Sequence, residues 1–122
     1  MRRPIFLAAA LLAACATVPP AAAGPVAGLG QVASVEGIRI RPLRVIEDSR
    51  CPANANCVWA GRLVLRAEVQ SRGRSETRDL TLGVPIDVEA GRLTLAAAEP
   101  NRIAGREADP AAYRFTFSVE AR

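Results

Sequence analysis

Residues 113–120 read Tyr-Arg-Phe-Thr-Phe-Ser-Val-Glu, and this octapeptide carries the clearest structural signal in the chain. Apolar side chains alternate with polar ones along its whole length, which is the pattern of a β-strand with one buried and one solvated face. Tyr113, Phe115 and Phe117 stand on the apolar face. We therefore expect a central strand whose rings fill the core of an all-β domain.

Upstream of this strand, shorter runs with the same alternation are separated by turn residues. Ser71–Arg74 and Ala90–Gly91 are expected turns, because glycine adopts the positive φ that tight hairpins require. Six to eight short strands favour an antiparallel β-sandwich, immunoglobulin-like in type, with a small barrel as the alternative. The expected runs begin near Val32, Ile38, Leu63, Leu80, Val84 and Leu93.

Two features interrupt the alternating pattern. Pro42 breaks one run, and Leu43 and Val45 resume it in the opposite parity, which predicts a sheet edge or a β-bulge. Ala96–Ala98 and Asp109–Ala112 are the only hints of helix. We expect an irregular connection between those two segments.

Composition restricts the chemistry. The 122 residues suffice for one domain, and a hydrophobic content of 50% excludes a disordered chain. The sequence contains no histidine, and all 16 basic residues are arginine. Ser-His-Asp, Cys-His and Ser-Lys sites therefore lack their components, and a transition-metal site lacks ligands. We expect a protein that is not an enzyme and carries no cofactor.

The N-terminus has the pattern of an export signal. Arg2 and Arg3 precede the apolar run Ile5–Ala14, which is too short to cross a bilayer as a helix. Residues 12–15, Leu-Ala-Ala-Cys, resemble the lipobox of bacterial lipoproteins. The resemblance implies that Cys15 is acylated and becomes the first residue of the mature chain.

The same resemblance implies a location. Ala16 stands where an aspartate would retain a lipoprotein at the inner membrane, so we expect anchoring at the periplasmic face of the outer membrane. The alternative is an ordinary secreted protein cleaved after Ala21–Ala23. We assign residues 1–14 to the signal peptide, 15–30 to the lipidated cysteine and an Ala/Pro/Gly tether, and 31–122 to the β-sandwich.

The charge balance gives little information about partners. Loss of Arg2 and Arg3 leaves the mature chain only slightly basic, so we expect no nucleic-acid partner. We expect the outward-facing arginines to form a solvated face of a sheet, although an anionic partner such as lipopolysaccharide could also use them. These arginines are Arg39, Arg41, Arg62 and Arg66.

The segment 47–61, Glu-Asp-Ser-Arg-Cys-Pro-Ala-Asn-Ala-Asn-Cys-Val-Trp-Ala-Gly, is the distinctive part of the domain. Cys51 and Cys57 are the only cysteines left once Cys15 carries lipid, and in an oxidising compartment we expect them to pair. Asn54 and Asn56 suit a tight loop. The single tryptophan follows closely and could pack near the bridge.

Several roles are open to this segment. In a structural role, Asp48 and Arg50 hold each other or cap loop amides. In a binding role, the segment is a rigid recognition tip, as in an inhibitor that presents residues 51–57 to an envelope hydrolase. A calcium-dependent module would use oxygen ligands, whereas the C-x₅-C spacing argues against a redox pair. The candidate residues are Glu47, Asp48, Arg50, Asn54, Asn56 and Trp59.

The strings DSRCP (residues 48–52) and CVWAG (residues 57–61) resemble a motif of small bacterial lipoproteins of uncharacterised function. The resemblance implies lipidation, export and a β-rich domain. It assigns no functional residue, so the partner in the envelope stays open.

Overall fold

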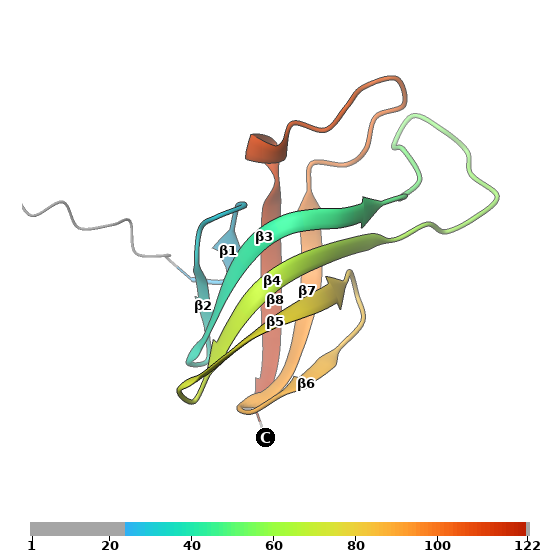
Figure 1. The fold of residues 1–122 in the computed structure, drawn as a ribbon. Helices are drawn as coiled ribbons and strands as arrows, with labels where there is room; N and C mark the ends of the chain where they lie inside the picture. Colours follow the sequence, from blue (N-terminus) through green and yellow to red (C-terminus); the bar gives the residue numbers. More distant parts are fainter. Residues whose placement is uncertain (1–23, 122) are drawn as a thin grey trace, which may run out of the picture.

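Two four-stranded antiparallel sheets make up the fold in the structure, a computed structural model that describes residues 24–121 (Figure 1). One sheet has the order β1-β8-β7-β6 and the other β2-β3-β4-β5, and they do not close into a barrel. The predicted antiparallel β-sandwich is confirmed. The elements are β1 Val26–Ala27, β2 Ala33–Val35, β3 Ile38–Asp48, β4 Leu63–Ser71, β5 Arg74–Thr81, β6 Ile86–Val88, β7 Gly91–Glu99, the 3₁₀ turn Pro110–Ala112 and β8 Arg114–Ala121.

The core lies between the two sheets. As predicted, β8 is an inner strand, and the rings of Phe115 and Phe117 are buried. Tyr113 is also buried and stacks on Phe115, with ring centroids 5.4 Å apart. The fully buried aliphatic side chains that complete this core come from both sheets: Ile38, Ile40, Leu63, Leu65, Val69, Leu80, Leu93 and Leu95.

The strands are connected as a meander. In one sheet β2 to β5 follow one another along the chain, and in the other β6 to β8 do so, with β1 added beside β8. An immunoglobulin domain instead has Greek-key connections. The two-layer architecture therefore matches the expectation, whereas the order of connections differs from the immunoglobulin type.

The structure corrects two local expectations. The predicted bulge at Pro42 is present, between Pro42 and Arg44, but Pro42 itself is buried and Leu43, expected to resume the apolar pattern, is exposed. Ala96–Ala98 is not helical: it belongs to β7, which pairs with β8 through a bulge between Leu95 and Ala97. The second helical hint is confirmed as a single 3₁₀ turn capped by Asp109.

The folded domain begins earlier than the predicted boundary at residue 31. Val26 and Ala27 form β1, and Ala27 is buried against the core. The described part of the predicted tether, residues 24–30, thus belongs to the sandwich. The predicted signal peptide, Cys15 and residues 16–23 lie outside the described residues. No helix within residues 24–121 has the length and apolarity to cross a membrane.

Candidate functional site

The distinctive segment forms a long loop at one end of the sandwich. Asp48 and Leu63 are the last paired residues of β3 and β4, so residues 49–62 leave the sheet (Figure 1). The Ser49 amide donates to the Arg62 carbonyl at 2.8 Å and closes the base of this loop. Gly61 adopts a φ of 64°, and a Cβ there would overlap the Ser49 carbonyl. The sequence needs glycine at this point because the two ends of the loop approach so closely.

Asp48 and Arg50 form an ion pair at the start of loop 49–62. The Arg50 Nε donates to Asp48 Oδ1 at 2.9 Å, and Nη2 donates to Oδ2 at 3.0 Å. The two side chains are only 10% and 14% exposed. Two parallel charge-assisted bonds fix the relative orientation of both groups. The predicted interaction between these two residues is confirmed.

This ion pair also ties the two sheets together. Arg50 Nη1 donates to the Ala98 carbonyl in β7, and Nη2 donates to the Pro100 carbonyl, each at 3.0 Å. The Tyr113 hydroxyl donates to Asp48 Oδ2 at 2.9 Å. Asp48 ends a strand of one sheet, while Ala98 and Tyr113 belong to or adjoin strands of the other. The D-S-R part of the motif therefore closes one end of the sandwich.

The network stabilises the ionised form of its carboxylate. Burial opposes ionisation of Asp48, but the hydrogen bonds from Arg50 and Tyr113 outweigh it and lower its pKa below 3.8. Burial and donation to Asp48 raise the pKa of Tyr113. The hydrogen bond to Asp48 raises the pKa of Arg50. All three groups therefore keep their ordinary charge states at neutral pH.

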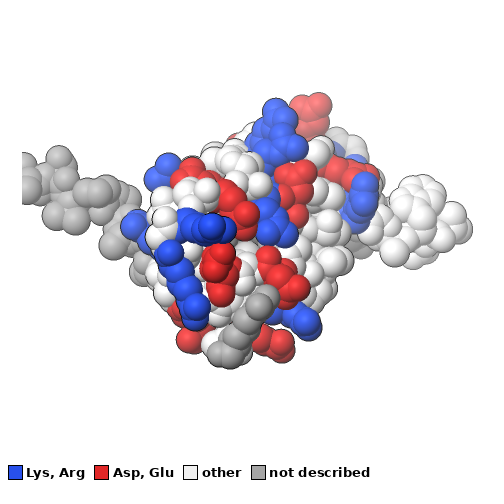
Figure 2. All heavy atoms as spheres, turned by 60° about the horizontal axis from the view of Figure 1, so that its bottom comes forward, with Lys and Arg blue, Asp and Glu red and all other residues white. Residues whose placement is uncertain are grey.

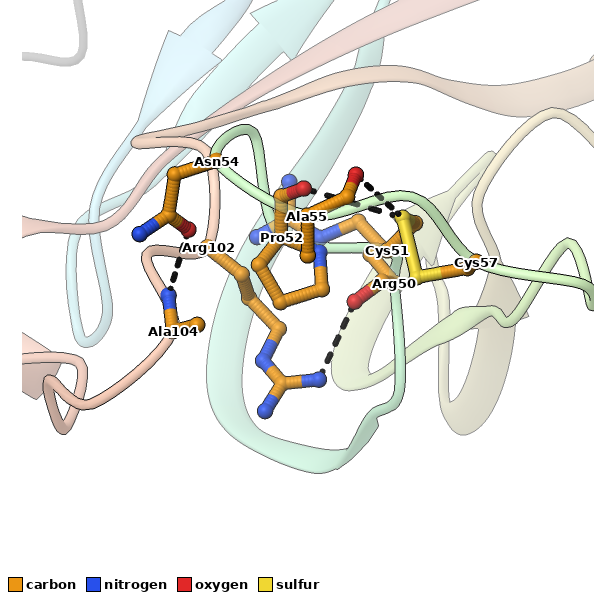
Figure 3. Close-up of a disulfide and its surroundings, with 8 residues drawn as sticks. All are labelled: Arg50, Cys51, Pro52, Asn54, Ala55, Cys57, Arg102 and Ala104. Atoms are coloured by element: carbon orange, nitrogen blue, oxygen red, sulfur yellow. Dashed lines mark hydrogen bonds between the residues drawn. A yellow bond between two sulfur atoms is a disulfide. The ribbon is translucent and has the colours of Figure 1, made fainter.

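A disulfide joins Cys51 to Cys57, as expected, with their Cα atoms 5.8 Å apart. The bridged segment is attached to a second loop, residues 100–109, by main-chain and side-chain contacts (Figure 3). The Ala53 amide donates to the Arg102 carbonyl at 2.8 Å, and the Ala104 amide donates to Asn54 Oδ1 at 2.8 Å.

A third contact completes this attachment. The Arg102 Nη1 donates to the Arg50 carbonyl at 3.0 Å, as Figure 3 shows. Loop 49–62 is therefore fixed from three directions: by its own disulfide, by loop 100–109 and by the Asp48–Arg50 pair. The local sequence of residues 100–109 does not predict these contacts with loop 49–62.

The part of the loop beyond the disulfide projects into solvent. Val58 is 97% exposed and Trp59 is 64% exposed, so the tryptophan does not bury its ring beside the bridge. Asn56 is exposed as well. We call Val58 and Trp59 the tip. A large aromatic side chain held out on a fixed loop is a common feature of binding sites.

The structure does not bring the candidate calcium ligands together. Both carboxylate oxygens of Asp48 accept hydrogen bonds from Arg50, and Asn54 Oδ1 accepts one from Ala104. Glu47 forms an ion pair with Arg62 at 2.6 Å. Within residues 24–121, no three His, Cys, Asp or Glu residues cluster as metal ligands.

The surface charges are mixed in sign. Arg66 is paired with Asp79 on the neighbouring strand, and Arg39 and Arg41 line a hollow of about 120 Å³ together with Glu68. Figure 2 shows basic and acidic side chains interspersed on the face that it presents. This arrangement agrees with a solvated sheet face and shows no strongly basic patch on that face.

A hollow of about 240 Å³ lies against loop 100–109 and the Asp48–Arg50 pair, and its lining has no single sign of charge either. Its charged lining consists of three arginines and three carboxylates, so it does not select an anion or a cation by net charge. These residues are Arg50, Arg102, Arg106, Asp48, Glu107 and Asp109.

Comparison with known proteins gives no match to this chain among family models, curated proteins or solved structures. Function is therefore inferred from the loop and from the sequence. Among the large apolar side chains of the described residues, those of the tip are the most exposed.

Proposed function

We propose that this protein is an exported lipoprotein, held at the periplasmic face of the outer membrane by lipid on Cys15, and that it acts as a non-enzymatic binding module. The observation that carries the proposal is the tip on its fixed loop. Val58 and Trp59 contribute nothing visible to the core, yet a disulfide and three sets of hydrogen bonds hold the loop that presents them.

The physical argument concerns entropy. A flexible loop loses conformational freedom when it binds, and this loss weakens the complex. The Cys51–Cys57 bridge and the contacts with loop 100–109 restrict the loop before any partner arrives. Binding through the tip would then retain most of the free energy of burying an indole ring.

The residue inventory supports a role without catalysis. The chain has no histidine and no lysine. The least exposed carboxylate near the loop, Asp48, is held ionised between Arg50 and Tyr113 and is therefore a poor proton donor. A purified domain that hydrolysed an envelope substrate, and lost this activity on carboxylate substitution, would contradict the proposal.

Anchoring is tested by the mass of the protein produced in its own host. We expect acyl chains on Cys15 and loss of residues 1–14, with the protein in the outer-membrane fraction. The control is Cys15→Ser, which removes the acceptor thiol and should leave the protein unacylated. Native material without acyl mass would refute the anchor.

A second candidate is an inhibitor of an envelope hydrolase. The observation that favours it is the projection of the bridged loop beyond the sandwich (Figure 1). Lysozyme and protease assays with added domain test this candidate. Inhibition by the wild-type chain but not by Trp59→Ala would support it, and unchanged rates at micromolar domain would count against it.

A further inference from the structure

We propose that the tip is a second membrane contact, which inserts Val58 and Trp59 into the headgroup region of a phospholipid bilayer and so fixes the orientation of the sandwich. The inference rests on the proposed function, because lipid on Cys15 would bring the loop to the membrane. It names the ligand of the binding loop as the bilayer surface.

The chemistry of the loop suits a lipid interface. Residues 51–61 contain no charged side chain. Tryptophan favours the boundary between headgroups and acyl chains, because its ring is apolar while its N–H can still reach water. Figure 2 shows uncharged atoms projecting from one side of a body whose surface carries mixed charges.

The charges at the base of the loop do not oppose insertion. Arg62 is paired with Glu47 at 2.6 Å, and Arg50 is paired with Asp48 at 2.9 Å. The hollow beside the loop also balances arginines against carboxylates. Without excess positive charge, the contact should depend little on anionic lipid or on salt.

The shape of the apolar surface favours a bilayer over a protein partner. A stable protein interface covers about 800 Å² on each side, far more than two side chains supply. The other large exposed apolar residues lie on different elements: Val26 on β1, Leu43 and Ile46 on β3, Val84 before β6 and Ile103 on loop 100–109. Of these, Ile103 is on the loop that contacts loop 49–62, and its single side chain adds little area. A bilayer, in contrast, requires only a small projecting tip.

The anchor would convert a weak contact into an effective one. Two inserted side chains bind a membrane poorly by themselves, but a tethered domain meets the bilayer at a high effective concentration. The chain from Cys15 to Gly24 spans at most roughly 30 Å. Since Figure 1 places β1 and the loop on opposite sides of the sandwich, both contacts together lay the domain along the surface.

The fluorescence of Trp59 tests this directly, because it is the only tryptophan in the sequence. The mature chain from Cys15 to Arg122 contains every strand of the fold. With Cys51 and Cys57 bridged, Cys15 is its one free thiol and can be coupled to a maleimide lipid. The probe is a vesicle of phosphatidylethanolamine and phosphatidylglycerol, prepared with and without brominated acyl chains.

We expect a blue shift of Trp59 emission on the vesicles and loss of most of the emission with brominated lipid. Val58→Ser should weaken both effects without changing the melting temperature, since Val58 is almost fully exposed. The matched control is Val84→Ser, which alters an exposed valine away from the loop and should leave both effects unchanged. Higher salt should have little influence.

Unchanged Trp59 emission on the coupled vesicles would overturn the inference. A blue shift that also appears on a soluble maleimide polymer would overturn it too, because it would indicate contact with a second copy. A blue shift of Trp59 emission with a periplasmic protein but not with vesicles would assign the tip to a protein partner. Since the coupling is chemical, none of these results depends on whether the cell acylates Cys15.

Discussion

At the scale of single residues, Gly61 offers the sharpest test of the loop geometry. Its φ of 64° and the nearby Ser49 carbonyl both disfavour a side chain. Gly61→Ala should cost about 3 kcal/mol of unfolding free energy, measured by urea denaturation followed by circular dichroism.

Gly73 is the matched control for this substitution. It has a similar φ of 77°, but a Cβ there would meet nothing within 4 Å. Gly73→Ala should therefore cost only about 1 kcal/mol, for the left-handed backbone alone. Equal losses at the two positions would show that the close approach at Gly61 has no energetic importance.

The lowered pKa of Asp48 implies that the free energy of unfolding depends on pH. Its pKa is lowered in the folded state, so its contribution is complete above the ordinary value of 3.8 and is lost as the pH falls through the folded-state pKa. Asp48→Asn should lower the stability at pH 7 by about 2 kcal/mol. The difference in Tm from wild type should then shrink below pH 3.8.

The exposed Arg66–Asp79 pair supplies the control for this experiment. Asp79→Asn should change Tm little at any pH, because ion pairs open to solvent contribute little. A Tm difference between wild type and Asp48→Asn that stayed constant down to acid pH would refute the role given to the ionised carboxylate.

Individual residues also show which contacts could be predicted from the sequence and which could not. Alternation placed Tyr113 correctly in the core, but it could not reveal that the hydroxyl donates to Asp48, 65 positions away. Short spacing made the Asp48–Arg50 pair predictable, because the two side chains are two residues apart. Arg102 was missed, since its partner is a carbonyl in a distant loop.

At the scale of elements, loop 49–62 should depend on its bridge. Closing so short a loop contributes about 2 kcal/mol in the chain-entropy model. The double variant Cys51→Ser with Cys57→Ser should lose about this amount and leave the strands intact. Hydrogen exchange should accelerate for the amides of residues 53–60 and stay unchanged in β4 and β5. Equal exchange in both proteins would mean that loop 100–109 and the Asp48–Arg50 pair hold the loop without the disulfide.

The pairing of whole strands also explains which predictions from the sequence were wrong. Three alanines at 96–98 favour a helix by intrinsic propensity, yet pairing with β8 makes them a strand. The bulge between Leu95 and Ala97 also hides the alternation that would have revealed this strand. The predicted bulge at Pro42 leaves Leu43 without a partner on β4, and Leu43 is exposed there. A second bulge, between Val45 and Glu47, follows it.

At the scale of the whole molecule, the sandwich and its core follow from the alternating pattern, whereas the N-terminal boundary does not. Pro, Gly and Ala between residues 24 and 30 have the composition of a linker. Their role depends on main-chain bonds, which leave no mark on composition. Pro25 accepts from Phe117, Gly24 accepts from Ser34, and Gly30 donates to Pro42.

This boundary yields the last prediction. A chain that starts at residue 31 loses β1, the buried Ala27 and the hydrogen bonds of Gly24, Pro25 and Gly30, and it uncovers an edge of β8. We expect it to lose about 3 kcal/mol of stability and to aggregate more readily, because the exposed strand edge can pair with another chain. A chain that starts at residue 24 should match the mature protein in Tm and in sedimentation. If both truncations behaved alike, residues 24–30 would be a linker after all, and the reach of the anchor would be longer than the geometry of β1 allows.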